Sequence, residues 1–399
     1  MIKNKTTIYI FLIFLSFNVK AQNKIFNVID SITNLPISKA SVLSKISKDG
    51  SITNNDGNVK INTSHINDTL VISCVGYETK KIDLINFGKA DLDTIKMVPS
   101  ILLLNEVKIN WIDLKKKFAD LLKNYGKFYF TSPILYNCTY KENVKINDSL
   151  ARLIQVQLKW YDKSYGLDFS QQFDVQNKIS LINIDYSKIL NLNNAVYKAQ
   201  SYIENPDLFK LLHLNFYPLF INEANQINIK SIDNYQYFNR VTFSSPIIEH
   251  DSTVMFIKDG VIDFDNITGA IIGLDFNNVY NRQIKILKSV KEPQIDYTSE
   301  VKSQHIKLTF KKYNKEKWVI SSFKSDIVVE LKIPTKSYNS TDKISQEFLI
   351  TNIEENVKIP KKEQIDLKKP FYLNFPTNKN LDTKILLTKE EEDFIKKKN

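Results

Sequence analysis

The stretches TNNDG at residues 53–57 and LVISCVGY at residues 70–77 decide the fold that we expect for the first part of this chain. On either side of the first stretch, apolar and polar residues alternate in short runs, at residues 26–43 and 59–62. Such alternation is typical of half-buried β-strands. The Asp-Gly pair between two runs predicts a tight hairpin, because glycine adopts positive φ without steric cost and aspartate stabilises the turn.

The second stretch is apolar almost throughout from Leu70 to Val75 and predicts a strand that is buried on both faces. It ends at Gly76, where the chain is expected to bend. Runs at residues 82–84 and 95–98 supply the last strands. The first part of the chain is therefore expected to form a small β-sandwich.

A family resemblance is carried by residues spread through this segment. They are Asp30, Thr33, Pro36, Ala40, Val42, Thr53, Asp56, Gly57, Leu70, Ile72, Ser73, Val75, Gly76 and Tyr77. At these positions the segment resembles the carboxypeptidase regulatory-like domain, which is common in secreted proteins of Bacteroidota. The resemblance implies a transthyretin-like sandwich of about seven strands over residues 22–109, closing on LNEVKI at residues 104–109. It implies a fold and no activity.

Residues 1–21 have the pattern of a secretory signal peptide. Two lysines precede a mostly apolar run at residues 8–19, and Val19 and Ala21 stand where small residues predict cleavage before Gln22. A membrane span needs about 20 apolar residues, so the run is too short to be one. We expect export to the periplasm or the outer-membrane surface, with no transmembrane span in the mature chain.

The formal net charge of +11 does not indicate a nucleic-acid partner. Arg152, Arg240 and Arg282 are the only arginines among 55 basic residues. Arginine is the side chain that makes bidentate contacts with phosphates and bases. The lysines are spread along the chain among carboxylates. The expected partner is another envelope protein or a cell-surface ligand.

Cys74 and Cys138 are the two cysteines. An even number in an exported protein permits a disulfide. Cys74, however, lies in the strand predicted to be most buried, and Cys138 lies in a different predicted domain. Free thiols that pack as small hydrophobic groups are the favoured interpretation.

Residues 110–399 predict an α+β domain with one large curved antiparallel sheet. Apolar residues recur at helical spacing over residues 111–126, with Gly126 as the expected stop. Asn205, Pro206 and Asp207 predict a second helix start. A capping box from Thr388 predicts a short last helix, unless this end is a solvated tail. Alternating runs predict strands at residues 136–140, 151–160, 226–232, 235–243, 303–310, 318–323 and 327–333.

Residues 254–280 predict a three-stranded meander with turns at Asp259-Gly260 and at residues 266–269. The phrases DGVID at residues 259–263 and GAII at residues 269–272 resemble a pattern found behind the same N-terminal module in secreted proteins of Bacteroidota. The resemblance implies a half-barrel similar to that of lipoprotein carriers.

No short motif for catalysis, cofactor binding or metal binding stands out. The four histidines are His65, His213, His250 and His305. None belongs to a His-Glu-x-x-His pattern, and neither a Gly-x-Ser-x-Gly elbow nor a phosphate-binding glycine loop is present. Asp251 and Ser252 follow His250, but triads are assembled across a fold, so a polar loop explains this run. We expect no catalytic residue, no cofactor, no metal and no enzymatic activity.

Two further residue sets have both a functional and a structural interpretation. Asp263 and Asp265 share one side of a predicted strand, and a solvated strand face is favoured over a glycosidase pair. Clustered aromatic residues suit either a ligand groove or the core of a sheet, and the core is favoured because half-buried strands are rich in aromatics. They are Trp160, Tyr161, Tyr165, Phe169, Tyr235, Tyr237 and Phe238.

The function expected from the sequence is a non-catalytic binding or scaffolding module of the cell envelope. The alternative is a half-barrel carrier of a lipid or other apolar ligand, and an enzyme without recognisable motifs comes third. A carrier is expected to show apolar residues on both faces of its strands, one for a helix and one for the ligand. Two strands instead show a polar set, which favours the scaffold and predicts no bound lipid. These sets are Leu153, Gln155, Gln157 and Lys159, and Ser303, His305, Lys307 and Thr309.

Overall fold

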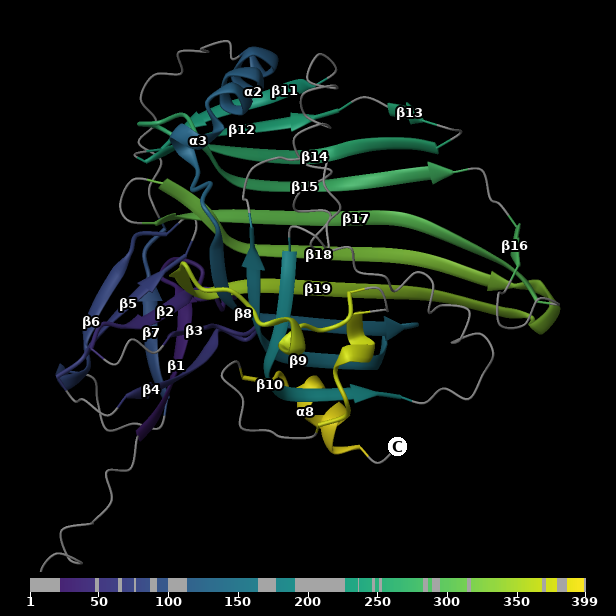
Figure 1. The fold of residues 1–399 in the computed structure, drawn as a ribbon, viewed down its shortest axis with the longest axis horizontal. Coiled ribbons are helices and arrows are strands. Elements are labelled where there is room, and N and C mark those ends of the chain that lie inside the picture. Colours follow the sequence, from purple (N-terminus) through teal and green to yellow (C-terminus); the bar gives the residue numbers. More distant parts are fainter. Residues whose placement is uncertain are drawn as a thin grey trace, which may run out of the picture. The chain divides into compact units, whose positions relative to one another are not determined.

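The computed structural model describes residues 22–46, 50–63, 67–74, 77–86, 92–99, 113–163, 177–190, 227–235, 237–245, 248–250, 253–282, 286–288, 295–313, 317–367, 371–378 and 386–397. The chain divides into two compact units. The first comprises Met1–Ser100 with Thr383–Thr388, and the second comprises Ile101–Asp382 with Lys389–Asn399. Figure 1 shows both as ribbons, and each is described by itself.

The first unit consists of two small sheets. Its elements are β1 (Gln22–Asp30), β2 (Ser41–Ser44), β3 (Gly50–Ile52), β4 (Asn58–Thr63), β5 (Thr69–Ser73), β6 (Lys80–Asp83), the 3-10 turn η1 (Leu84–Asn86) and β7 (Leu92–Met97). One sheet has the order β4-β1-β7 and the other has the order β3-β2-β5-β6. Phe26, Val42 and Ile72 belong to one buried apolar cluster drawn from both sheets. This is the seven-stranded arrangement that the sequence predicts.

Two details of the sequence prediction for this unit are wrong. The Asp-Gly turn does not close a hairpin, because β3 and β4 belong to different sheets. Gly57 has φ of +76°, and a Cβ at this position would lie 2.6 Å from the carbonyl oxygen of Val28, so the turn does require glycine. Strand β5 is buried on alternate residues, on one face instead of both.

The second unit is built on one large antiparallel sheet. Its strands are β8 (Ile134–Ile146), β9 (Ser149–Asp162), β10 (Asn177–Ile189), β11 (Asn228–Asn234), β12 (Phe238–Ser244), β13 (Ile248–His250), β14 (Thr253–Asp265), β15 (Ile271–Arg282), β16 (Ile286–Lys288), β17 (Asp296–Tyr313), β18 (Lys317–Ile333) and β19 (Tyr338–Glu355). Ten of them follow the order β10-β9-β8-β19-β18-β17-β15-β14-β12-β11, while β13 pairs with β14 and β16 with β17. The predicted large curved antiparallel sheet is confirmed.

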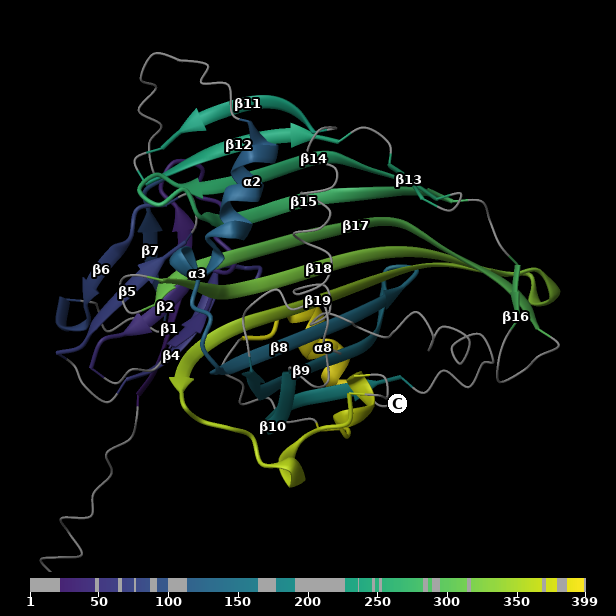
Figure 2. The ribbon, with the colours of Figure 1, turned by 45° about the horizontal axis from the view of Figure 1, so that its top comes forward.

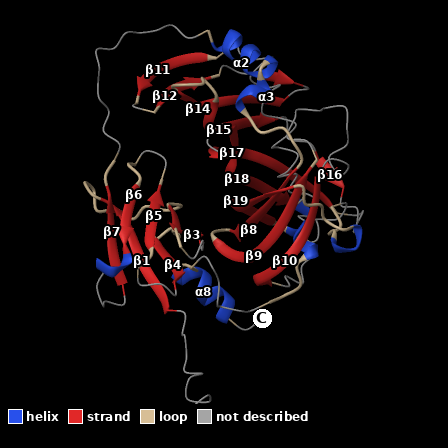
Figure 3. Ribbon diagram, turned by 60° about the vertical axis from the view of Figure 1, so that its left-hand side comes forward, coloured by secondary structure: helices blue, strands red, loops and turns tan. Residues whose placement is uncertain are grey.

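The sheet bends into an arc that has an inner and an outer face. Figure 3 shows α2 (Leu114–Lys123) and α3 (Tyr125–Phe128) on the inner side and α8 (Lys389–Lys396) on the outer side. We call the face that carries Phe276, Leu308 and Phe323 the inner face, and the face that carries Asp275 and His305 the outer face. In Figure 2, α2 lies across β14 and β15. The remaining short helical turns are η4 (Pro334–Lys336), η5 (Lys361–Glu363) and η6 (Phe371–Asn374).

The predicted helices at 111–126 and after Thr388 are present within the described residues, with changed details. Gly126 lies inside α3 instead of ending the first helix, which stops at Lys123. The last helix is not a solvated tail, because Phe394 and Ile395 are buried. Glu391 is also buried, and its carboxylate lies 2.7 Å from Lys141 Nζ on the outer face of β8.

Two predicted breaks in the sheet are continuous strand. β18 runs through the predicted gap between residues 323 and 327. Asp259-Gly260 lies inside β14, at a register shift against β15, so the meander is a hairpin with a β-bulge. A Cβ on Gly260 would lie 2.3 Å from Phe243 Cζ. Glycine stands here because the Phe243 ring packs directly on the backbone of the neighbouring strand.

Several predictions fall on residues outside the described ranges. These are the signal segment 1–21, the junction at residues 105–110, the helix start at Asn205, and the residues Tyr165, Phe169, His65, His213, Asp251 and Ser252. Cys74 and Cys138 are both free thiols, the first partly buried and the second buried. Within the described residues, no helix is long and apolar enough to cross a membrane.

Replacing Gly260 with alanine should destabilise the second unit by about 1–3 kcal/mol, because the added methyl group has to displace the Phe243 ring. Chemical denaturation followed by tryptophan fluorescence reports on this unit, since Trp111, Trp160 and Trp318 all lie in it. Gly126→Ala is the matched control. Its Cβ would have no neighbour closer than 3.8 Å, and alanine in a helix should be neutral or stabilising. An unchanged midpoint for Gly260→Ala would refute the packing argument.

Candidate functional site

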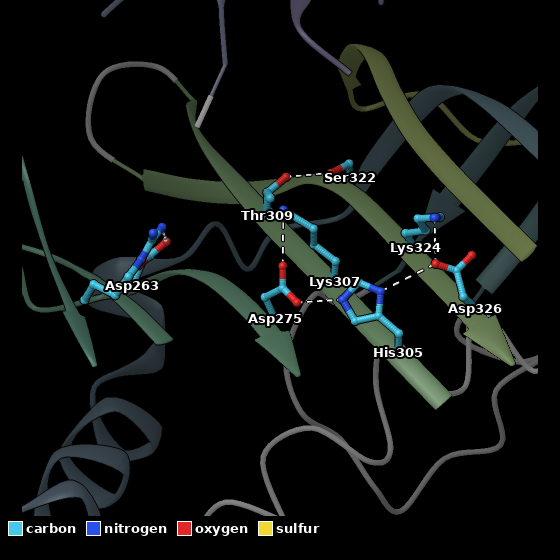
Figure 4. Close-up of polar contacts among 9 residues, drawn as sticks. Asp263, Asp275, His305, Lys307, Thr309, Ser322, Lys324 and Asp326 are labelled. Carbon is cyan, nitrogen blue, oxygen red and sulfur yellow. Dashed lines mark hydrogen bonds and ion pairs between the residues drawn. The ribbon is translucent and has the colours of Figure 1, made fainter. Parts of the chain in front are cut away.

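The outer face carries a network of charged groups around His305, one of the four histidines considered in the sequence. His305 on β17 lies between two aspartates from neighbouring strands, with Nε2 2.6 Å from Asp275 Oδ1 and Nδ1 3.5 Å from Asp326 Oδ2. Lys307 lies 3.2 Å from Asp275, and Lys324 lies 2.6 Å from Asp326. Figure 4 shows this charged network, with the Thr309–Ser322 hydroxyl pair beside it. The sequence did not pair His305 with a carboxylate because both aspartates come from other strands.

The protonation states in this network argue against a general-base role for His305. Hydrogen bonds with Asp275 and Asp326 raise the pKa of His305 to about 9. Burial alone would raise the pKa of Asp326, but the hydrogen bond from His305 and the charge of Lys324 outweigh it and hold this pKa below its usual value. A histidine that stays protonated, with both ring nitrogens facing carboxylates, cannot act as a general base near neutral pH. The network is a set of ion pairs on a half-exposed strand face.

The described residues contain no cluster of three or more histidine, cysteine, aspartate or glutamate side chains that could hold a metal ion. Asp263 and Asp265 do not form the solvated face that the sequence predicts, because both are buried. Asp263 accepts two hydrogen bonds from Arg240, at 2.7 and 2.9 Å. Asp265 accepts hydrogen bonds from the backbone N–H and hydroxyl of Thr268 and so shapes the turn after β14. Each carboxylate has a structural partner.

The aromatic candidates separate into three groups. Trp160 is fully buried, which confirms the core interpretation, and Tyr161 is buried in a smaller cluster. Tyr235 and Phe238 stack at 4.4 Å between ring centroids, with the Arg240 guanidinium over both rings. Tyr237 is exposed. These residues do not converge on one groove. His250 ends β13, and the two candidates that follow it, Asp251 and Ser252, lie outside the described residues.

The inner face carries a continuous apolar row that crosses all ten strands of the main path. Each member is the register partner of the next, from the edge strand β11 to the opposite edge strand β10. The row is Ile232, Val241, Ile262, Leu274, Leu308, Phe323, Phe348, Tyr140, Val156 and Ile184. Nine inter-strand gaps of about 4.8 Å give it a length of roughly 43 Å. We call it the apolar row.

Described segments cover the apolar row near its two ends. On one side α2 packs on β14, with Phe118 and Phe264 ring centroids 6.5 Å apart. On the other side η6 packs on β8, with Phe371 edge-on to Tyr140 at 4.9 Å. The row members on β17, β18 and β19 lie between these two contacts. Both helical segments therefore use the face of the sheet on which the apolar row lies.

The polar strand sets that favoured a scaffold behave differently from each other. In β17 the polar set lies on the half-exposed outer face, as predicted. In β9 half of the expected wet face is buried, with Leu153 and Gln155 both at 0% exposure, while Gln157 and Lys159 are partly exposed. Gln155 Nε2 donates to Asp185 on β10 at 3.0 Å. The predicted wet face of β9 is wrong at Leu153 and Gln155, because the sequence did not show that α8 and β10 pack against this part of the strand.

Comparison with known proteins supports the N-terminal resemblance. The model of the CarboxypepD_reg-like domain matches residues 27–109. The residues that carry the match hold turns in place. Asp30 accepts hydrogen bonds from the backbone N–H groups of Ile32 and Thr33, and the Tyr77 hydroxyl donates to its other oxygen at 2.8 Å. No curated protein sequence matches the chain.

Three solved structures share part of the chain trace. A putative outer membrane lipoprotein-sorting protein domain from Vibrio parahaemolyticus is 8% identical, over 62% of this chain and 96% of that one, with a TM-score of 0.25. A DUF1329 family protein from Desulfovibrio piger is 10% identical, over 63% and 96%, with a TM-score of 0.27. Lipovitellin is 8% identical, over 59% and 27%, with a TM-score of 0.24. At these TM-scores the likenesses carry no argument about function.

Within the outer-face network, His305 should make the stability of the fold decrease as the pH rises above neutrality. The folded pKa of His305, about 9, lies above its ordinary value of 6.5. Its contribution is therefore fully present below pH 6.5 and is lost as the pH rises through 9. Lys311 acts in the opposite sense, because burial lowers its pKa to about 8. The difference in melting temperature between wild type and His305→Gln isolates the histidine. It should shrink from pH 6.5 to 9.5, and a difference that stays constant over this range would contradict the assignment.

Proposed function

We propose that the second unit binds a lipid-like apolar or amphipathic molecule on the inner face of its curved sheet, and that the protein is a carrier of the cell envelope. The observation that carries this proposal is the apolar row, which runs without interruption over ten paired strands. An acyl chain occupies about half of a bilayer core of about 30 Å. The row of roughly 43 Å therefore exceeds the length of one chain.

The energy of such binding is adequate. Each methylene group removed from water contributes about 0.8 kcal/mol. About ten methylenes therefore give about 8 kcal/mol, which corresponds to a micromolar complex before the cost of immobilisation is subtracted. Leu308, Phe323 and Phe348 in the middle of the row are at most 4% exposed in this structure, so a bound chain would take the place of the groups that cover them.

The scaffold interpretation loses its main support. It rested on the assumption that a helix and a ligand would occupy opposite faces of the sheet, so that a polar face excluded a carrier. In the structure α2 and η6 pack on the same face as the apolar row, and the outer face needs no apolar side chains. A polar outer face is therefore compatible with a carrier whose helices and ligand share the inner face.

The carrier proposal includes no catalytic step and places the protein in the periplasm or at the outer-membrane surface. The signal-like segment at residues 1–21 and the regulatory-like module at residues 27–109 support this location. The module supplies no candidate site of its own among its described residues, since the motif residues Asp30, Thr53 and Tyr77 are engaged in holding turns.

Protein purified from its native envelope should carry about one lipid per chain, measured by solvent extraction and lipid mass spectrometry. Phe323→Gln places a polar group in the middle of the apolar row and should reduce the recovered lipid at least several-fold. The matched control is Ser322→Gln, the adjacent residue on the outer face, which should retain the lipid. If wild-type protein yields no lipid and does not enhance the fluorescence of phenylnaphthylamine, the carrier proposal fails. This readout stands even if Phe323→Gln does not fold.

A further inference from the structure

A belt of buried polar side chains crosses the inner face next to the apolar row. It contains Asn278 on β15, Gln304 on β17, Ser325 on β18, Gln346 on β19, Glu142 on β8 and Arg152 on β9. All six are at most 9% exposed. We call this set the polar belt. It lies between the apolar row, from which Phe276 and Ile306 separate it on β15 and β17, and an apolar cluster that includes Val144, Val329 and Ile344.

Most of the polar belt is internally hydrogen-bonded. Gln304 Nε2 donates to Ser325 Oγ at 3.2 Å and its Oε1 accepts from the Tyr280 hydroxyl at 3.0 Å. Gln346 Nε2 donates to the Tyr140 hydroxyl at 3.0 Å and to Glu142 at 3.2 Å. Polar groups buried among apolar ones need such partners to be tolerated.

The charges in the polar belt balance each other. Arg152 Nε lies 2.5 Å from Glu142 Oε1, and both side chains are 1% exposed. The Tyr140 hydroxyl donates to the same carboxylate. This pair lies on β8 and β9, at least four strands away from Asn278 on β15, where the neighbouring Gln304 is bonded to the uncharged Tyr280 and Ser325. A charged head group at that end of the belt would lose its hydration without gaining an opposite charge. The belt therefore suits a ligand group without net charge.

One hydrogen-bond acceptor of the polar belt, on Asn278, has no donor among the described residues. Asn278 is 4% exposed, and its Oδ1 has no hydrogen-bond partner within the described part of the chain. Its register partner Gln304 has both amide atoms engaged by Tyr280 and Ser325. A buried carbonyl oxygen without a donor is destabilising, and such groups are rare in folded proteins. A hydrogen-bond donor for Asn278 Oδ1 would therefore have to come from outside the described residues.

We propose that the polar belt receives the head of a neutral amphipathic lipid that carries a hydroxyl or amide N–H group, which donates a hydrogen bond to Asn278 Oδ1 while the acyl chain lies along the apolar row. This assignment rests on the carrier function proposed above and names the class of ligand. It separates hydroxyl- or amide-bearing neutral lipids from fatty acid anions, anionic phospholipids and plain hydrocarbons.

The test uses two probes that share one chain, oleyl alcohol and its methyl ether. The alcohol has a hydroxyl donor and the ether does not. Each is titrated against the mature protein loaded with phenylnaphthylamine, and displacement gives its affinity. The alcohol should bind about tenfold more tightly than the ether, a factor equivalent to about 1.4 kcal/mol. In Asn278→Leu this preference should disappear while the ether affinity is unchanged.

Asn277→Leu is the matched control, because residue 277 is exposed on the outer face of the same strand and pairs with His305. It should keep the tenfold preference. Asn278→Leu should also unfold at the same temperature as wild type or higher, since it removes an unpartnered buried acceptor. If leucine does not fit at this position, Asn278→Ala gives the same comparison.

Three results would overturn the assignment, and they differ from one another. Equal affinities for alcohol and ether in wild type would refute the role of Asn278 and leave the carrier proposal standing. Failure to bind phenylnaphthylamine or either probe would remove the carrier proposal and this assignment with it. A preference that persists in both Asn278 variants would place the donor contact elsewhere and also refute the assignment.

Discussion

The structure of the second unit depends on the two-residue period of side chains along paired strands. Once ten strands are held in register, every second residue of each strand is committed to the same face. A slip of one residue in any strand would move a member of the apolar row, such as Leu308 or Phe323, to the charged outer face. The opposite exchange would bury Lys307 or Lys324. The cost of both changes fixes the register, and the register in turn assembles the apolar row.

The same constraint explains where the charged groups lie. On the outer face, Asp275, His305 and Asp326 stand on three successive strands and reach each other across the sheet. Water covers part of this face, so these pairs contribute modestly to stability. On the inner face, Glu142 and Arg152 are fully enclosed and are tolerated because they neutralise each other and share hydrogen bonds with Tyr140 and Gln346. Burying two charges costs free energy of desolvation, so the Glu142–Arg152 pair is better explained by the hydrogen-bonding groups that it places in the polar belt than by a gain in stability.

The two units show why a family resemblance can define a fold and leave function open. In the first unit, the residues that carry the resemblance are engaged locally: Thr53 accepts a hydrogen bond from the Ala40 backbone, donates to the Ile37 carbonyl, and so fixes a turn. In the second unit, the residues of the apolar row and the polar belt are ordinary apolar or polar residues of a strand. Their significance comes from their neighbours on other strands, which a short motif does not record.

The sequence by itself determined the mainly β class, the two described helices near residues 114 and 389, and most strand positions, because these follow from local periodicity and turn chemistry. The seven strands of the first module were implied by the family resemblance. It did not separate bulges from turns at Asp259-Gly260, since this depends on the Phe243 ring from another strand. It also assigned Gln155, Asp263 and Asp265 to solvent. Gln155 and Asp263 have partners on other strands, and Asp265 is buried with its carboxylate bonded to Thr268 in the turn after β14. Beyond the local pairing predicted at residues 254–280, the tertiary structure alone decided which strands pair and which face is inner. Only that pairing brings Asn278, Gln304 and Glu142 onto one belt, because strand order and sheet curvature are properties of the whole chain.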